Sequence, residues 1–152
     1  GLINKYNTKA PFVKALSDRC MQKASSEGII RTKLGRKCRF DMWEPKDFGI
    51  HTAERFDNAS AKYGAANIKR AFTYKALNRL IQGSAADQTK QAVVDCHEKG
   101  FTPMLQIHDE LCFSIKKDED VKIIKDAMEN CMELKVPSVV DIAIGKDFGE
   151  AS

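Results

Sequence analysis

A histidine followed by two carboxylates separates two apolar runs in residues 104–115, M-L-Q-I-H-D-E-L-C-F-S-I. Short apolar runs on either side of a charged two-residue hinge predict a tight β-hairpin with Asp109 and Glu110 at its tip. Adjacent carboxylates held on strands provide the hard oxygen ligands that Mg²⁺ prefers. An ordinary solvated turn has the same composition, so the rest of the chain must decide between a metal site and a simple turn.

Length and composition describe an ordinary globular protein. The chain has 152 residues, of which 43% are hydrophobic and 30% charged, which predicts a single domain with one core. It contains no apolar run long enough to span a membrane and no signal-peptide pattern at its start. Its five cysteines show no C-x-x-C spacing. We therefore expect reduced, buried thiols in a cytosolic protein rather than disulfides or a zinc site.

Charge is distributed unevenly along the chain. Residues 1–40 carry ten Lys or Arg and two acidic residues, a net charge of +8, whereas the remainder has a net charge of −4. A basic half joined to a slightly acidic half favours a polyanionic partner for the first. The alternative is a solvated helix face rich in lysine.

The first half of the chain predicts a helix, a hairpin and a long irregular segment. Apolar residues recur at helical spacing over 7–27, and Gly28 is a suitable left-handed stop. Two strand-like pieces flank the turn at 33–36, and Arg36 and Lys37 would project beside it. These basic residues could contact phosphates or be ordinary solvated turn charges. Residues 41–64, which include the scattered apolar residue Phe48, show no sustained period, and we expect one short helix near 51–62.

The second half predicts helices around the central hairpin. Residues 65–99 are expected to form two helices, with a break at Gln82-Gly83 and Ser84 as the cap of the second. A helix with Asp118 as its N-cap should run to about Leu134. A third strand at 138–144 and a tail at 145–152 complete an α+β fold, in which an antiparallel sheet is covered by helices on one face.

Three polar residues share one face of the first of these helices. Lys75, Asn78 and Gln82 are spaced at i, i+3 and i+7, and an apolar face of Tyr74, Leu77 and Ile81 is expected beside them. Amide groups in such a stripe can bind either base edges and sugars or solvent. The two other histidines are expected at the surface (His51) and at a helix C-terminus (His97).

Two stretches together resemble a known family. The run K-A-L-N-R-L-I-Q-G-S-A-A-D-Q-T-K-Q-A at 75–92, followed by L-Q-I-H-D-E-L-C-F, resembles the C-terminal part of family A DNA polymerases. E-G-I-I-R-T-K-L-G-R-K-C-R-F at 27–40 resembles the segment behind the nucleotide-binding helix of that family, and K-V-P-S-V-V-D-I-A-I-G-K-D-F at 135–148 resembles its last palm strand. The resemblance covers nearly the whole chain in the right order.

The resemblance implies a role for each matching residue. Asp109 corresponds to the aspartate of motif C, which binds two catalytic Mg²⁺ ions (or Mn²⁺), and Glu110 to its auxiliary neighbour. His108 corresponds to a histidine near the primer terminus. Asn78 and Gln82 correspond to amides that contact template and primer in the minor groove, with Lys75 beside them. The implied reaction is attack of a primer 3′-hydroxyl on the α-phosphate of a dNTP.

The resemblance also implies a division of the chain and some missing parts. Residues 1–64 would belong to the fingers and residues 65–152 to the palm. Neither the second metal-binding aspartate (motif A) nor the fingers helix with its catalytic Lys, Arg and Tyr (motif B) is found in this sequence, and Tyr74 stands where the family has an arginine. We therefore expect the isolated chain to be inactive until it meets a chain that carries both motifs.

The same resemblance implies which partners the chain binds. Primer-template DNA and dNTP are the expected partners, in the cytoplasm of a bacterium or a phage-infected host, with no membrane association. We also expect self-association, or docking of another chain, along an uncovered sheet edge. The alternatives are a stand-alone duplex-DNA-binding module and a non-catalytic remnant.

Overall fold

The computed structural model describes residues 1–47 and 49–151, so Phe48 and the last residue of the expected tail, Ser152, lie outside the described residues. The chain divides into two compact units, 1–84 and 85–152, rather than forming the single domain expected from its length. Both units mix helices with antiparallel strands, which confirms the α+β class. Nowhere in the described ranges is there a helix of the length and apolarity that a membrane span requires.

The first unit begins with two helices, α1 (Leu2–Lys9) and α2 (Pro11–Glu27), where the sequence predicted one helix over 7–27. The break falls at Ala10, whose φ of −130° and ψ of 60° are not helical. Proline causes this break, because its ring disfavours the helical conformation in the preceding residue. Gly28 ends α2 in the left-handed conformation, with φ +70°, as predicted.

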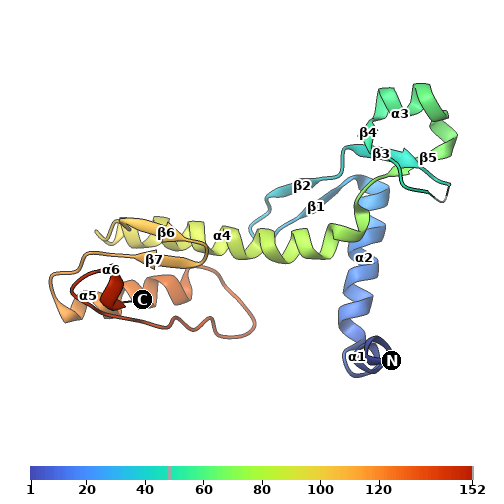
Figure 1. The fold of residues 1–152 in the computed structure, drawn as a ribbon. Helices are drawn as coiled ribbons and strands as arrows, with labels where there is room; N and C mark the ends of the chain where they lie inside the picture. The colour runs from blue at the N-terminus through green and yellow to red at the C-terminus, as the bar shows by residue number, and fades with distance from the viewer. Residues whose placement is uncertain (48, 152) are drawn as a thin grey trace. The chain divides into compact units, whose positions relative to one another are not determined.

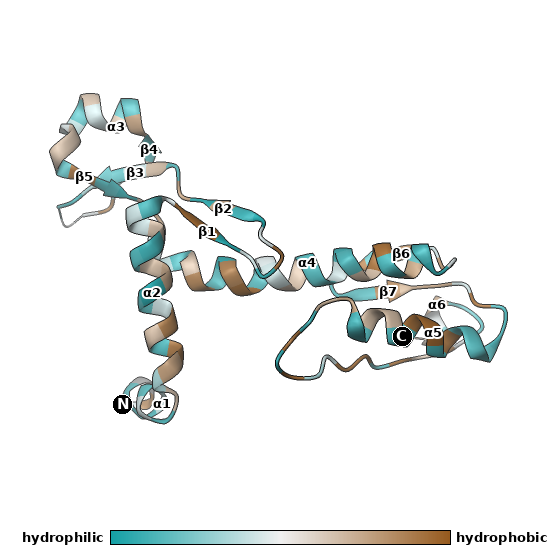
Figure 2. Ribbon diagram, turned by 180° about the vertical axis from the view of Figure 1, so that it is seen from behind, coloured by the Kyte–Doolittle hydropathy of each residue, from teal (hydrophilic) through white to brown (hydrophobic). Residues whose placement is uncertain are grey.

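A β-hairpin follows directly. Strands β1 (Ile29–Arg31) and β2 (Lys37–Arg39) pair antiparallel, as expected, with Ile30 opposite Cys38. Figure 2 shows the contrast between the two strands, since β1 is coloured largely as hydrophobic and β2 as hydrophilic. The apolar side chains meet α2 and the start of α4 in a core of Cys20, Ala24, Ile30, Phe40 and Ala76.

Residues 41–71 are more regular than the sequence indicated. A sheet in the order β4-β3-β5 is formed by β3 (Met42–Pro45), β4 (Glu54–Arg55) and β5 (Ile68–Arg70). The expected short helix is α3 (Phe56–Tyr63). Trp43 holds this sheet together. Its ring lies 5.0 Å from that of Phe56 and 4.6 Å from the Arg70 guanidinium carbon. Strands of two to four residues are too short to show an alternating pattern, which is why the sequence did not reveal them.

The prediction of two helices over 65–99 is wrong. The short 3₁₀ helices η1 (Ala65–Asn67) and η2 (Thr73–Lys75) flank β5, and a single helix α4 (Ala76–Glu98) runs through Gln82-Gly83 without a break. Ser84 therefore lies inside a helix and is not an N-cap. An isolated glycine lowers helix stability by about 1 kcal/mol, which neighbouring contacts can offset.

The second unit places a hairpin and a helix beside the C-terminal part of α4 (Figure 1). Strands β6 (Leu105–Ile107) and β7 (Glu110–Cys112) form the predicted central hairpin, and α5 (Asp118–Asn130) follows. Cys96 of α4 packs with Ile124 and Ala127 of α5 to form the core of this unit. The N-cap of α5 is Lys117 rather than Asp118, and the helix ends four residues before the predicted Leu134.

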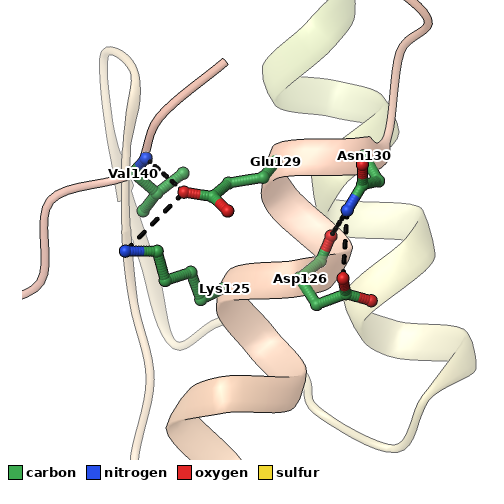
Figure 3. A network of polar contacts seen from close by, with 5 residues as sticks. All are labelled: Lys125, Asp126, Glu129, Asn130 and Val140. Carbon is green, nitrogen blue, oxygen red and sulfur yellow. Dashed lines mark hydrogen bonds and ion pairs between the residues drawn. The ribbon is translucent and has the colours of Figure 1, made fainter. Parts of the chain in front are cut away.

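The third strand predicted at 138–144 is absent from the described residues of this segment, so the β6–β7 sheet has two strands. The segment is instead held to α5 by a side chain (Figure 3): Glu129 Oε1 accepts a hydrogen bond from the Val140 N–H at 2.9 Å. Within α5, the same oxygen pairs with Lys125 at 3.7 Å. The expected tail contains a short helix, α6 (Phe148–Ala151). A strand needs a neighbouring strand for its backbone groups, and none pairs with this segment in the described part of the chain.

Candidate functional site

The tip of the β6–β7 hairpin differs by one residue from the prediction. Ile107 pairs with Glu110, so the two turn residues are His108 and Asp109, and Glu110 is the first residue of β7. His108 has a φ of +54°, and a positive φ at the first turn position is a feature of type II′ hairpins. Gln106 supports this conformation, because its Nε2 donates to the His108 carbonyl at 3.1 Å. The structure thus brings His108, Asp109 and Glu110 together at one tip.

Both carboxylates of the tip are exposed to solvent. The Glu110 side chain has one partner on its own strand, since the Cys112 thiol donates to Glu110 Oε1 with an Sγ–O distance of 3.6 Å. Desolvation and this bond to Glu110 raise the pKa of the Cys112 thiol. The thiol therefore stays protonated near neutral pH and remains a donor, so it does not add a negative charge beside Glu110.

The chemistry of this donor set suits a hard divalent cation. Mg²⁺ takes six oxygen ligands and is usually bound by one or two carboxylates, together with water and substrate phosphates. Asp109 and Glu110 could supply those carboxylates. No group of three or more metal-ligating side chains occurs among the residues that the structure describes. The remaining ligands would therefore have to come from water, substrate or other protein oxygen atoms.

The polar stripe predicted along the helix is accessible. Asn78 and Gln82 lie on α4 and are exposed, and Lys75 is exposed at the end of η2. The Lys75 ammonium lies 5.1 Å from the centre of the Phe72 ring and 5.6 Å from that of Tyr74. Three groups able to donate hydrogen bonds thus face solvent from consecutive turns of the chain.

The apolar face expected beside this stripe is only partly buried. Leu77 packs against the core of the first unit. Tyr74 is 66% exposed and Ile81 54% exposed, so these two side chains of the face lie at the surface. An exposed tyrosine and isoleucine beside two amides extend the accessible surface of this part of α4.

The two candidate phosphate contacts differ in their surroundings. Lys37 begins β2 and is exposed. Arg36 is exposed too, but its Nη2 donates to the Gly83 carbonyl of α4 at 2.7 Å. Part of the Arg36 guanidinium is therefore used in an intramolecular hydrogen bond. This bond places Arg36 next to the helix that carries Gln82.

Sequence reasoning did not single out Arg79. Its Nη1 donates to the Arg39 carbonyl at 2.8 Å, and its guanidinium carbon lies 4.5 Å from the centre of the Phe40 ring. The available signal was spacing, because residues 75, 79 and 83 form one helical row beside the amide stripe. Arg79 fixes the hairpin to the helix that carries Asn78.

The other two histidines lie away from these groups. His51 is only 23% exposed at its side chain, and its Nε2 lies 3.2 Å from an Asp47 carboxylate oxygen, so the expected surface histidine is in fact half-buried. His97 is exposed, and its Nδ1 lies 2.9 Å from Thr102 Oγ1. Each of them thus has one polar neighbour, a carboxylate oxygen for His51 and a hydroxyl for His97.

A basic unit with exposed amides, and a second unit that presents two carboxylates on a hairpin tip, are features of enzymes that act on nucleic acids with divalent metal ions. The sequence model described as DNA polymerase family A matches residues 1–150. The chain belongs to this family, whose members are nucleotidyltransferases that act in DNA replication.

Individual relatives agree with this assignment. The chain is 38% identical to the DNA-directed DNA polymerase of Pseudomonas phage M6 over 150 residues, which cover 99% of this chain and 19% of the relative. It is 31% identical to DNA polymerase I of Bacillus subtilis over 159 residues, covering 98% of the chain and 16% of the relative. The chain thus spans about a fifth or less of the length of these curated relatives.

A solved structure has a similar fold. The POL domain of Pol1 from M. smegmatis, in complex with DNA primer-template and dNTP, superimposes with a TM-score of 0.63. The two sequences are 26% identical, and the match covers 89% of this chain and 22% of the other.

Proposed function

We propose that this chain supplies part of the active site of a DNA-directed DNA polymerase, which transfers nucleotides from dNTPs to a primer 3′-hydroxyl. The observation that carries the proposal is the pair of exposed carboxylates, Asp109 and Glu110, at a hairpin tip in a chain of family A. The solved structure similar to this chain was determined with primer-template DNA and dNTP, which supports the same substrates here.

In this proposal, Asp109 is the principal metal ligand and Glu110 an auxiliary one. Two bound Mg²⁺ ions, or Mn²⁺ in their place, would stabilise the attacking and leaving oxygens of the transfer. The carboxylates bind the ions and need not exchange protons. His108 would present its side chain from the turn toward the primer terminus. The backbone conformation at this position has a positive φ and is supported by the hydrogen bond from Gln106 to the His108 carbonyl.

The first unit would bind the duplex. Asn78 and Gln82 donate to minor-groove acceptors, which every base pair offers, so these amides sense duplex shape without reading sequence. Lys75, Arg36 and Lys37 provide positive charge for phosphates. The net charge of this unit supports the assignment, since residues 1–84 contain 17 basic and 7 acidic residues.

We further propose that the chain is a C-terminal portion of the catalytic machinery, with fingers residues at 1–64 and palm residues at 65–152. Two carboxylates do not complete a two-metal site, and a motif A aspartate and a motif B helix from elsewhere would have to join them. The chain alone would then be inactive, and its place of action would be the cytoplasm of a bacterium or a phage-infected host.

The test is reconstitution of primer extension. The chain is mixed with a polypeptide that carries motifs A and B, and extension is measured with Mg²⁺ and with Mn²⁺. Asp109→Asn should lower the extension rate by more than about 100-fold. Loss of a residue that only supports a metal ligand typically lowers activity by about 10- to 100-fold, so a direct ligand should cost more. Asp141→Asn, at another exposed aspartate, is the matched control and should keep the wild-type rate. Normal extension by Asp109→Asn would remove Asp109 from the metal site.

A second candidate function is a stand-alone duplex-DNA-binding module, which the charge of the first unit favours. In that case the chain alone would bind primer-template DNA with an affinity that falls steeply with salt, and reconstitution would give no extension. The absence of binding at low salt would eliminate this alternative.

A further inference from the structure

The helix that carries Asn78 and Gln82 passes unbroken through Gly83, although a glycine at this position predicts a break. The space beside Gly83 is occupied by the β1–β2 hairpin. A Cβ atom built on Gly83 would lie 2.8 Å from Thr32 Cγ2 and 3.3 Å from Arg36 Nη2. A contact under 3 Å is not tolerated by real Cβ atoms, so only glycine allows the hairpin this close to the helix backbone.

Two hydrogen bonds join the hairpin to the helix at this close approach, and a third lies within the helix. Ser84 Oγ accepts from the Lys33 backbone N–H at 3.0 Å and donates to the Leu80 carbonyl at 2.7 Å. Arg36 Nη2 donates to the Gly83 carbonyl at 2.7 Å. The hairpin therefore contacts the two residues that directly follow Gln82, one through a side-chain hydroxyl and the other through the helix backbone.

The turn that makes these contacts is closed by hydrogen bonds of its own. Thr32 is buried, and its Oγ1 accepts from the Arg36 N–H at 3.0 Å. The backbone closes the turn twice, from Thr32 N–H to the Arg36 carbonyl and from Gly35 N–H to the Thr32 carbonyl, both at 3.0 Å. A rigid turn can hold a helix in one conformation, whereas a flexible one would follow it.

We propose that the β1–β2 turn is a clamp that positions the Asn78 and Gln82 amides, with Gly83 and Ser84 as positioning residues. The inference rests on the proposed binding of duplex DNA by those amides. A glycine, and a serine bonded to the carbonyl four residues back, both make a helix easier to bend. Amide hydrogen bonds to base edges need placement within about 0.5 Å, which an unclamped helix would not provide.

The experiment compares two DNA duplexes. One is a natural primer-template; the other carries 3-deazapurines, in which the minor-groove N3 acceptor is replaced by C–H. The dissociation constant of each is measured at low salt by fluorescence anisotropy, and their ratio reports hydrogen bonds to the minor-groove N3 rather than phosphate contacts. The wild-type chain should bind the modified duplex roughly two- to tenfold more weakly. Gln82→Ala should lower the ratio toward one, with only the Asn78 contact remaining.

The positioning residues are tested with the same ratio. Ser84→Ala should lower it toward the Gln82→Ala value although Gln82 is still present, and Ser84→Thr, which keeps the hydroxyl, should restore it. Ser26→Ala is the matched control, because Ser26 Oγ makes the same bond to the carbonyl four residues back (Gln22, 2.9 Å) on another helix. It should leave the ratio unchanged, since a merely structural serine has no effect on minor-groove contacts.

A pair of complementary variants tests the steric part. Gly83→Ala should lower the ratio by pushing the turn away, and adding Thr32→Ser, which removes the Cγ2 methyl and keeps the hydroxyl, should recover it. If Gly83→Ala does not fold, as judged by circular dichroism, the Ser84 variants decide alone. Wild-type ratios in both Ser84→Ala and Gly83→Ala would overturn the clamp while Gln82→Ala still supports duplex binding. A wild-type ratio of one, with no effect of Gln82→Ala, would overturn the amide contacts and the clamp with them.

Discussion

The two compact units carry opposite charge around cores of different make-up. Residues 1–84 contain 17 basic and 7 acidic residues, whereas residues 85–152 contain 8 basic and 14 acidic residues. The first unit buries Ile30 and Phe40 among two helices and a hairpin, while the second centres on Cys96, Ile124 and Ala127. Both units expose large apolar side chains, such as Leu2 at 87% in the first, but in the second they recur along one segment, 134–148, which includes Val139 at 73%.

This difference separates two tasks. The first unit combines its own core with a positive surface, which suits a polyanion. The second unit leaves much apolar surface uncovered around its acidic hairpin, and such surface usually marks contact with other protein.

The core of the first unit should depend most on Phe40, which is 2% exposed. Phe40→Ala removes a buried ring and the contact with Arg79, so the free energy of unfolding should fall by about 3–5 kcal/mol. Urea unfolding followed by Trp43 fluorescence measures this unit selectively, because Trp43 is the only tryptophan of the chain. Phe12→Ala, at a phenylalanine that is 71% exposed, should change it by less than about 0.5 kcal/mol. Equal effects of the two variants would contradict the assigned core.

The exposed apolar side chains of the second unit should drive association. Val139→Lys should weaken self-association about 10- to 100-fold, which corresponds to burial of one large apolar side chain. Light scattering over a range of concentrations measures the effect. Leu2→Lys, at an 87% exposed leucine of the first unit, is the control and should leave association unchanged. A wild-type chain that stays monomeric at all concentrations would show that this surface does not self-associate.

The positive charge of the first unit should determine the salt dependence of DNA binding. Lys37→Ala removes one proposed phosphate contact and should lower the slope of log K against log salt by about 0.9. Between 50 and 200 mM salt, the variant should therefore lose about threefold less affinity than the wild-type chain. Lys116→Ala, in the second unit, should not change the slope. A reduction by both variants alike would assign the slope to overall charge rather than to the first unit.

Local patterns predicted several elements well. The proline and glycine at the two ends of α2 determine where that helix begins and ends, and the apolar runs around 108–110 indicated the β6–β7 hairpin. These features depend on neighbouring residues only. The turn itself was displaced by one residue, because the positive φ of His108 is set by strand register and not by residue type.

Features that depend on distant contacts were not predictable in the same way. Gly83 predicts a helix break until Thr32 and Arg36 are seen to fill the space beside it. Strand β3 has partners on both sides from residues 10 or more positions away, and the segment at 138–144 lacks such a partner in the described chain. The roles assigned to Asp109, Asn78 and Gln82 stay predictions. The exposure of a side chain shows that a ligand can reach it, but does not identify that ligand.

Thiol ionisation should produce the smallest effect, and mainly in the second unit. Burial, followed by the nearby Asp95 carboxylate, raises the pKa of the Cys96 thiol above its ordinary value of 9.0. The unfolded chain then loses this proton at lower pH than the folded chain, so the stabilisation is complete below pH 9 and is lost as the pH rises through the folded pKa. At pH 9 the loss should be at most about 0.4 kcal/mol. Urea unfolding in reductant between pH 7 and 10 should show a shallower alkaline decline for Cys96→Ala. Thr89→Ala, at a buried residue of the same helix that does not titrate in this range, should lower the free energy of unfolding equally at every pH. If the free energy of unfolding of both variants declines in parallel with that of the wild-type chain, Cys96 does not cause the loss of stability at alkaline pH.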